Sequence, residues 1–224
     1  YFGGNWGTVM QVSFLFGAVV LLVVVLFSGT FRAWLKVFIS KHFYSYNYDY
    51  REEWLRFTRT LSEHGPGLGE RAIQAVAALV ESPGGALWIR REPGACVPAY
   101  SWHAALPTTH EPADSLFCQF LEQREWVFDL QEYEAGPDMY DNVPLPDWLR
   151  RFARGWLVVP LILHGKLFGF VVLQQPRSKI KLNWEVIDLL KIAGSQAASY
   201  LAQEDAAHAL MVARQFESFN RMST

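Results

Sequence analysis

The sequence predicts an α+β fold in which an antiparallel sheet is flanked by helices, preceded by a transmembrane helix and followed by a long helix. Two apolar runs rich in β-branched residues flank His164-Gly165-Lys166, and Gly165 can take the positive φ of a tight turn, which indicates a β-hairpin. Residues 1–31 contain no charged side chain. Residues 183–222 contain no proline and a single glycine, Gly194, which predicts a helix of about 40 residues.

These patterns divide the chain into four parts. We expect a transmembrane helix in residues 1–31, juxtamembrane amphipathic and linker helices in 32–66, the sheet domain in 67–182, and in 183–224 a long helix that closes the domain. Because the chain starts at Tyr1 and stops inside a predicted helix, we expect it to be an internal fragment of a longer protein.

The overall composition excludes some classes of partner. With 20 basic and 22 acidic side chains there is no basic excess of the kind that binds nucleic acid, so we expect no nucleic-acid partner. Cys96 and Cys118 are too few for a disulfide scaffold, which fits a reducing cytosol, and we expect them to be free thiols in the core.

Residues 9–27 are apolar except for Gln11 and Ser13. As a helix, this segment spans about 28 Å, close to the hydrocarbon thickness of a bilayer. The basic residues follow the segment, so the positive-inside rule places the C-terminal side in the cytoplasm; they are Arg32, Lys36 and Lys41. The lipid bilayer is therefore an expected partner.

Between the membrane segment and the sheet domain, residues 31–43 can form an amphipathic helix at the bilayer surface. Asp49 and Glu52 have the spacing of a capping box, so a second helix is expected to start there and to end at Gly65-Pro66-Gly67.

Within the domain, hydrophobic periodicity and turn residues predict the elements in order. They are a helix at 70–81, strands at 86–91 and 97–102, a short helix at 115–123, a strand at 126–130, a loop at 132–154 with a helical turn at Trp148-Leu149, and the hairpin at 155–176. Because both runs of the hairpin are almost continuously apolar, we expect it to lie at the centre of the sheet.

A small-molecule site, if present, is expected between the sheet and the loop 130–154, bordered by Tyr100, Trp102 and Phe128. The alternative is that these aromatic residues simply fill the core. The chain has no phosphate-binding loop and no catalytic or zinc motif, so we predict no catalytic residue, no metal site and no cofactor in it.

The second half of the long helix carries a thin apolar stripe with residues alternately four and three apart. The stripe, called the seam below, consists of Ala202, Ala206, Ala209, Ala213 and Phe216. It predicts a parallel homodimer with weak, adjustable packing, and the alternative is a solvated surface helix.

The order of these elements and the hairpin residues 158–161 (VVPL) and 165–173 (GKLFGFVVL) resemble a GAF domain. Over nearly the whole chain the sequence also resembles the PrsK-type sensor histidine kinases of PEP-CTERM systems. The residues that carry this second resemblance are 2–7 (FGGNWG), 40–43 (SKHF), 48–58 (YDYREEWLRFT), 81–88 (ESPGGALW), 197–201 (AASYL) and 213–217 (ARQFE).

The second resemblance implies phosphorelay signal transduction at the bacterial inner membrane, with the GAF domain in the cytoplasm and a role in exopolysaccharide or PEP-CTERM regulation. In that family a phosphoacceptor histidine and an ATP-binding domain lie beyond the segment that this chain covers, and a response regulator is the partner of that kinase domain. The resemblance transfers no catalytic residue and no ligand signature to this chain. Two alternatives stay open, a membrane-anchored GAF domain ahead of a cyclic-dinucleotide cyclase or phosphodiesterase, and a membrane-tethered interaction module.

Overall fold

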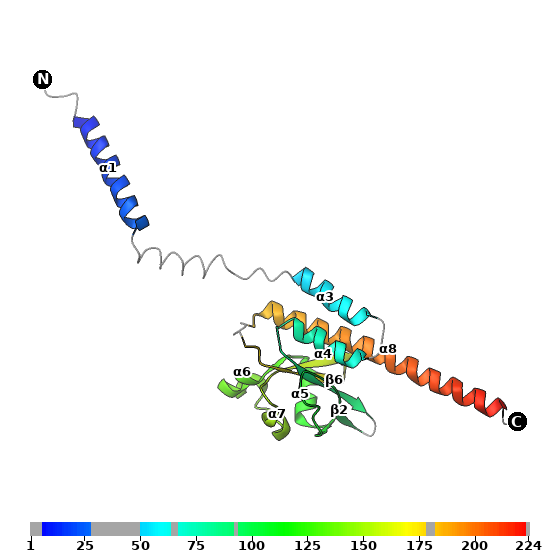
Figure 1. The fold of residues 1–224 in the computed structure, drawn as a ribbon. Coiled ribbons are helices and arrows are strands. Elements are labelled where there is room, and N and C mark those ends of the chain that lie inside the picture. The colour runs from blue at the N-terminus through cyan, green and yellow to red at the C-terminus, as the bar shows by residue number, and fades with distance from the viewer. Residues whose placement is uncertain (1–5, 28–49, 64–66, 92–93, 178–181, 223–224) are drawn as a thin grey trace. The chain divides into compact units, whose positions relative to one another are not determined.

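The computed structural model describes residues 6–27, 50–63, 67–91, 94–177 and 182–222. The chain forms two compact units, Tyr1–Asp49 and Tyr50–Thr224. The first unit contains helix α1, Trp6–Phe27 (Figure 1). Among the described residues, no helix is long and apolar enough to cross a membrane. The predicted transmembrane segment 1–31 and the amphipathic helix 31–43 lie partly or wholly outside these residues, and both stay predictions.

The second unit is built on a six-stranded sheet with the order β3-β2-β1-β6-β5-β4, in which all neighbouring strands are antiparallel. Its strands are β1 (Gly85–Arg91), β2 (Ala95–Trp102), β3 (Glu111–Pro112), β4 (Phe128–Asp129), β5 (Gly155–Leu163) and β6 (Lys166–Gln174). The α+β class with helices flanking an antiparallel sheet is confirmed.

The predicted central position of the hairpin holds for β6, which pairs with β1 in the middle of the sheet, whereas β5 lies next to the two-residue edge strand β4. The turn residues of the hairpin, His164 and Gly165, both have positive φ, 51° and 72°, the geometry that matches the twist of the two strands. Val158, Val159 and Val172 have no exposed surface, which shows that helices or loops cover both faces of the hairpin.

Helices α3 (Tyr50–Ser62), α4 (Leu68–Ala78) and α8 (Trp184–Met222) cover one face of the sheet, called the helical face below (Figure 1). Helix α8 packs on β5, α4 packs on β1 and β2, and α3 lies against both helices. The close approach of α8 to β5 requires a glycine at position 194, because a Cβ atom there would lie 2.4 Å from the carbonyl oxygen of Pro160 in β5. This close contact explains the single glycine of the helix.

The opposite face, called the loop face, is covered by α5 (Leu116–Arg124), α6 (Leu130–Ala135), the 3-10 helix η1 (Pro137–Tyr140) and α7 (Asp147–Arg151). Helix α7 confirms the predicted helical turn at Trp148-Leu149. The rest of the predicted loop is more ordered than expected. Helix α6 starts there because the Asp129 carboxylate accepts a hydrogen bond from the backbone N–H of Gln131 at 2.8 Å.

The long helix α8 is confirmed over 39 residues. In its first half Leu190, Ala193 and Leu201 are buried against the domain. Beyond Leu201 nearly all side chains up to Gln215 are exposed, and the orange-to-red end of the helix extends past the sheet (Figure 1). An ion pair between Arg91 Nη1 and Asp205 Oδ2, at 2.8 Å, ties the beginning of this exposed half to β1.

Candidate functional site

The aromatic residues that were predicted to border one pocket lie on two different faces of the sheet. Phe128 pairs with Val158 and belongs to the core of the loop face. Tyr100 pairs with Leu87, whose neighbour Ala86 belongs to that same core. Cross-strand partners share a face and successive residues alternate between faces, so Tyr100 lies on the helical face.

Tyr100 lies on the helical face because the pairing of β1 with β2 contains an irregularity. Simple alternation from Cys96, which lies in the loop-face core, would have placed Tyr100 and Trp102 on that face too. Instead the Tyr100 ring packs closely against Gly69 of α4. Trp102 stacks on His103 with ring centroids 4.2 Å apart. The three predicted residues therefore do not line a common cavity.

Under α7, the loop face carries a stack of aromatic rings. Trp88 of β1 is fully buried, and its ring centroid lies 4.7 Å from that of Trp148 of α7 and 5.4 Å from that of Phe170 of β6. The Trp148 and Phe170 rings are themselves 6.0 Å apart, so all three rings contact one another. The Trp88 indole N–H donates to the backbone oxygen of Thr109 at 3.1 Å. These rings fill the centre of the loop face.

Beside the stack lies a carboxylate, Glu111 of β3, which is only 5 % exposed. Its Oε2 atom accepts a hydrogen bond from the Trp148 indole Nε1 at 2.6 Å. A carboxylate that is withdrawn from water needs such a donor, because an unpaired buried charge is costly. The pair fixes Trp148 over the stack.

Two hollows meet at Trp148. The larger measures about 680 Å³ and includes Glu111, Ser115 and Phe117 in its lining. The smaller measures about 340 Å³. Both are lined by Thr109, Trp148 and Arg151, so they adjoin at these side chains, and together they are called the Trp148 hollow below. An aromatic wall beside a carboxylate suits a flat molecule that carries an N–H donor.

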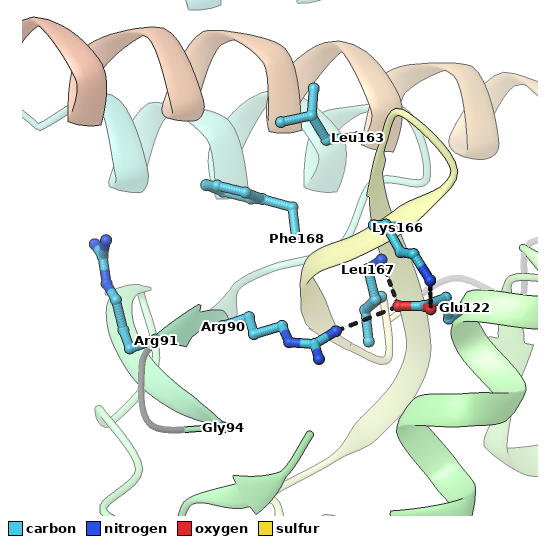
Figure 2. A pocket seen from close by; sticks show the side chains of 8 residues that line it. All are labelled: Arg90, Arg91, Gly94, Glu122, Leu163, Lys166, Leu167 and Phe168. Atoms are coloured by element: carbon cyan, nitrogen blue, oxygen red, sulfur yellow. Dashed lines mark hydrogen bonds and ion pairs between the residues drawn. The ribbon is translucent and has the colours of Figure 1, made fainter. Parts of the chain in front are cut away.

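A second hollow lies at the tip of the central hairpin, as Figure 2 shows, and is called the hairpin-tip hollow below. It measures about 610 Å³ and is lined by Arg90, Arg91, Gly94, Glu122, Leu163, Lys166, Leu167 and Phe168. Arg90 and Lys166 both turn toward the carboxylate of Glu122 (Figure 2).

The Glu122 carboxylate accepts from three donors. Its Oε2 atom receives the backbone N–H of Leu167 at 2.9 Å and Arg90 Nη1 at 3.3 Å, and its Oε1 atom receives Lys166 Nζ at 3.0 Å. The hydrogen bond from Leu167, followed by that from Lys166, holds the pKa of this carboxyl below its usual value. Sequence reasoning missed this cluster, because its members come from β1, α5 and β6 and no local motif connects them.

Cys96 of β2 and Cys118 of α5 are buried free thiols whose sulfur atoms lie 4.0 Å apart. The hydrogen bond from Cys96 lowers the pKa of Cys118, whereas the bond to Cys118 and burial raise the pKa of Cys96. Within the described part of the chain, no group of three or more His, Cys, Asp or Glu side chains is placed to hold a metal ion.

The predicted seam lies on the part of α8 that leaves the domain. Ala202 is half-buried, whereas Ala206, Ala209 and Ala213 are exposed. The side chain of Phe216 lies outside the described residues. The seam is therefore open to a partner helix over most of its length, and its pairing stays a prediction.

The GAF domain family model matches residues 68–201, and the chain belongs to this family. GAF domains are sensory regulatory domains of signalling proteins. No curated protein matches the chain.

Several solved structures have a similar fold. The GAF domain of a phosphoenolpyruvate-protein phosphotransferase from Coxiella burnetii is 15% identical, covers 71% of this chain and 96% of its own, and superposes with a TM-score of 0.55. The corresponding Acinetobacter domain is 14% identical with the same coverages and a TM-score of 0.53. The chromophore-binding domain of Stigmatella aurantiaca bacteriophytochrome is 15% identical, covers 72% of this chain and 62% of its own, and has a TM-score of 0.52. At these identities the likeness concerns the fold.

Proposed function

We propose that the chain is the sensory and signal-transmitting region of a membrane-bound two-component sensor histidine kinase of the PEP-CTERM type. The observation that carries this proposal is α8, which is packed on the GAF sheet in its first half and exposed in its second. A domain of this size does not need 39 helical residues for its own core, so the exposed half serves as a connection to another module.

The proposal assigns no chemistry to the chain itself. The parent protein would take ATP in a kinase domain after Thr224 and transfer phosphate from a histidine to a response regulator. This chain would sense a stimulus in the GAF domain and pass it along α8. The sequence segments that resemble these kinases, among them residues 48–58 and 213–217, support this assignment.

Membrane attachment is part of the proposal. In α1 the described side chains from Val9 to Val20 are exposed and almost all apolar, including Phe14 at 84 %. A helix that is apolar on all sides requires an apolar surrounding. The charge-free residues 1–31 and the basic residues that follow favour a bilayer, with the GAF domain in the cytoplasm.

The sensed ligand would be a small molecule in the Trp148 hollow. In support, this hollow combines an aromatic wall with a carboxylate that is 5 % exposed, and Trp148 lines both of its halves, so a movement of this side chain would change the shape of both. Trp148 sits on α7, a helix of five residues, which makes such a movement less costly than one of a strand.

The direct test reads the gene beyond Thr224 and then assays the complete protein in membranes with labelled ATP. We expect a phosphoacceptor histidine within about twenty residues and phosphate incorporation on it. A cyclase or phosphodiesterase signature in its place would contradict the kinase proposal and support the cyclic-dinucleotide alternative.

A second test concerns the connection. Two residues inserted between Ala209 and Leu210 rotate everything that follows by about 200°, whereas seven inserted residues nearly restore the orientation. We expect the two-residue insertion to change the kinase activity of the complete protein and the seven-residue insertion to leave that activity nearly unchanged. Equal effects of both insertions would contradict a relay through α8.

A further inference from the structure

We propose that the hairpin-tip hollow binds the phosphate group of a small organic molecule and that this binding acts on α8 through Arg91. The role of α8 as the receiver of this signal rests on the proposed function, whereas the binding of the phosphate does not depend on it. The site is distinct from the Trp148 hollow, since none of its lining residues is shared.

The charge of the hollow points to an anion. Arg90, Arg91 and Lys166 line it together with one carboxylate, Glu122. Arg90 and Lys166 share that carboxylate at 3.3 and 3.0 Å, so a single negative charge stands between two positive ones. A phosphate monoester carries nearly two negative charges and three acceptor oxygens. It therefore suits these cations better than a ligand carboxylate, which carries one charge and two oxygens.

The apolar wall indicates what else the molecule contains. Leu163 and Phe168 are half-buried and line the same hollow. Its volume of about 610 Å³ lies within the range of sites for small molecules. The occupant is therefore an organic phosphate with an apolar or aromatic part that contacts the Phe168 ring. The phosphate of a lipid headgroup has related chemistry, and the experiment below separates the two sources.

Arg91 connects the hollow to α8. Its Nη1 and Nη2 atoms lie 2.8 and 3.4 Å from the two carboxylate oxygens of Asp205. Asp205 stands four positions after Leu201, and no side chain from 202 to 215 is fully buried. Because both side chains of the pair are more than 40 % exposed, the pair is weak and can exchange partners.

A phosphate in the hollow competes with Asp205 for the Arg91 guanidinium. When Arg91 turns to the ligand, the exposed half of α8 loses its described ion pair with the sheet. If ligand binding weakens the Arg91–Asp205 pair, the pair must weaken ligand binding by the same factor. Removal of the Asp205 charge therefore frees Arg91 and strengthens ligand binding.

The binding test uses the complete 224-residue chain in dodecyl maltoside micelles and isothermal titration with phenyl phosphate. We expect Arg90→Gln combined with Lys166→Gln to weaken binding about tenfold or more, because charge-assisted hydrogen bonds to the phosphate are lost. Glu122→Gln should tighten binding, while its amide oxygen still accepts from Leu167. The matched control is Arg124→Gln, which removes another exposed arginine from a paired aspartate, Asp141.

Inorganic phosphate should bind several-fold more weakly than phenyl phosphate, because it cannot contact Phe168. The absence of binding, or an equal loss in Arg124→Gln, would overturn the site. Competition by phosphatidylglycerol in mixed micelles as strong as by phenyl phosphate would replace the small molecule by a lipid and would also overturn the proposal.

The coupling to α8 is measured by amide hydrogen exchange after Leu201. Phenyl phosphate should speed exchange in that segment of the unmodified chain and leave it unchanged in Arg91→Gln. Asp205→Asn should bind phenyl phosphate about threefold more tightly, and the control Asp141→Asn should not. Binding without any change in α8 exchange would refute the coupling, and this result is independent of whether a kinase follows Thr224.

Discussion

At the residue scale, the loop face depends on a hydrogen bond between two large side chains that are 37 positions apart. Glu111 lies at an edge of the sheet, and its carboxylate would be unpaired in the apolar surroundings of Phe117 and Trp148 without the indole donor. The same bond holds Trp148 where the two halves of the hollow adjoin. The stability of the loop face and the shape of the hollow are therefore linked at one residue.

Trp148→Phe keeps an aromatic ring and removes the donor. We expect unfolding free energy to fall by about 1–3 kcal/mol, because the buried carboxylate loses its partner. Urea denaturation measures the change. The control Trp126→Phe, at a side chain 43 % exposed, should cost less than about 0.5 kcal/mol.

A double-mutant cycle separates the hydrogen bond from lost ring volume. Trp148→Phe in a Glu111→Leu background should cost about 1 kcal/mol less than in the unmodified chain, because no carboxylate is then left unpaired. Equal costs in the two backgrounds would show that the hydrogen bond contributes nothing.

Glu122 makes the free energy of unfolding depend on pH, and the direction follows from its pKa. Its pKa in the folded chain is lowered, so the unfolded chain binds the proton more readily, and the stabilisation is complete above the unfolded value of about 4.5. It is lost as the pH falls through the folded pKa. The difference in unfolding free energy between the unmodified chain and Glu122→Gln should therefore be largest near pH 7 and shrink in acid. A difference that grows as the pH falls would contradict this.

At the element scale, Gly194 decides how closely α8 approaches β5. Helix propensity alone predicts that Gly194→Ala stabilises the chain by about 1 kcal/mol. The added Cβ would, however, lie 2.4 Å from a backbone oxygen that cannot easily move. We therefore expect a loss of about 1–3 kcal/mol. Thermal or urea unfolding decides the sign, with the exposed Gln196→Ala on the same helix as a near-neutral control; a stabilising Gly194→Ala would mean that the helix adjusts freely.

Much of the fold could be predicted from the sequence, because its elements have strong local patterns. The hairpin at Gly165, α8 and the turn at Trp148 follow from hydrophobic periodicity and turn residues. The short helix α6 was missed because a single Asp129 cap starts it.

The candidate sites were less accessible to prediction, since they depend on pairing between distant segments. The irregularity between β1 and β2 moves Tyr100 to the helical face. Its local signal is Pro98 of β2, which lies at the irregularity, because a proline cannot donate a hydrogen bond to a sheet ladder. Glu122 meets Arg90 and Lys166 only in the folded sheet.

At the scale of the whole molecule, we expect the first residue to lie outside the cytoplasm and the last inside, if the chain is anchored as proposed. Fusions at Tyr1 and Thr224 to a reporter that is active only in the periplasm test this arrangement. Activity at the N-terminal fusion alone is expected from the basic residues after position 31. Activity at the C-terminal fusion would contradict a kinase output, which must meet cytosolic ATP.

If α8 pairs in parallel as the seam predicts, a relay through it requires two packings of the helices that differ little in energy. Alanine side chains would bury little surface between the helices, so neither packing would be strongly preferred. Replacing Ala206 and Ala213 by leucine should strengthen dimerisation by about 1 kcal/mol or more per site and hold one packing. Analytical ultracentrifugation in detergent measures the dimer, and the exposed Gln203 and Ala207 changed to leucine serve as controls off the seam. An equal gain in these controls would mean unspecific association.

The most direct test of a dimeric signalling helix is a cysteine-crosslinking scan from position 202 to 216 in native membranes. Cys96 and Cys118, the only natural thiols, are first replaced by serine. Crosslinks between copies should peak at the seam positions 202, 206, 209, 213 and 216 and be weak between them. Crosslinks without this alternating spacing, or none between copies, would contradict the parallel seam and leave α8 as a solvated helix of a monomer.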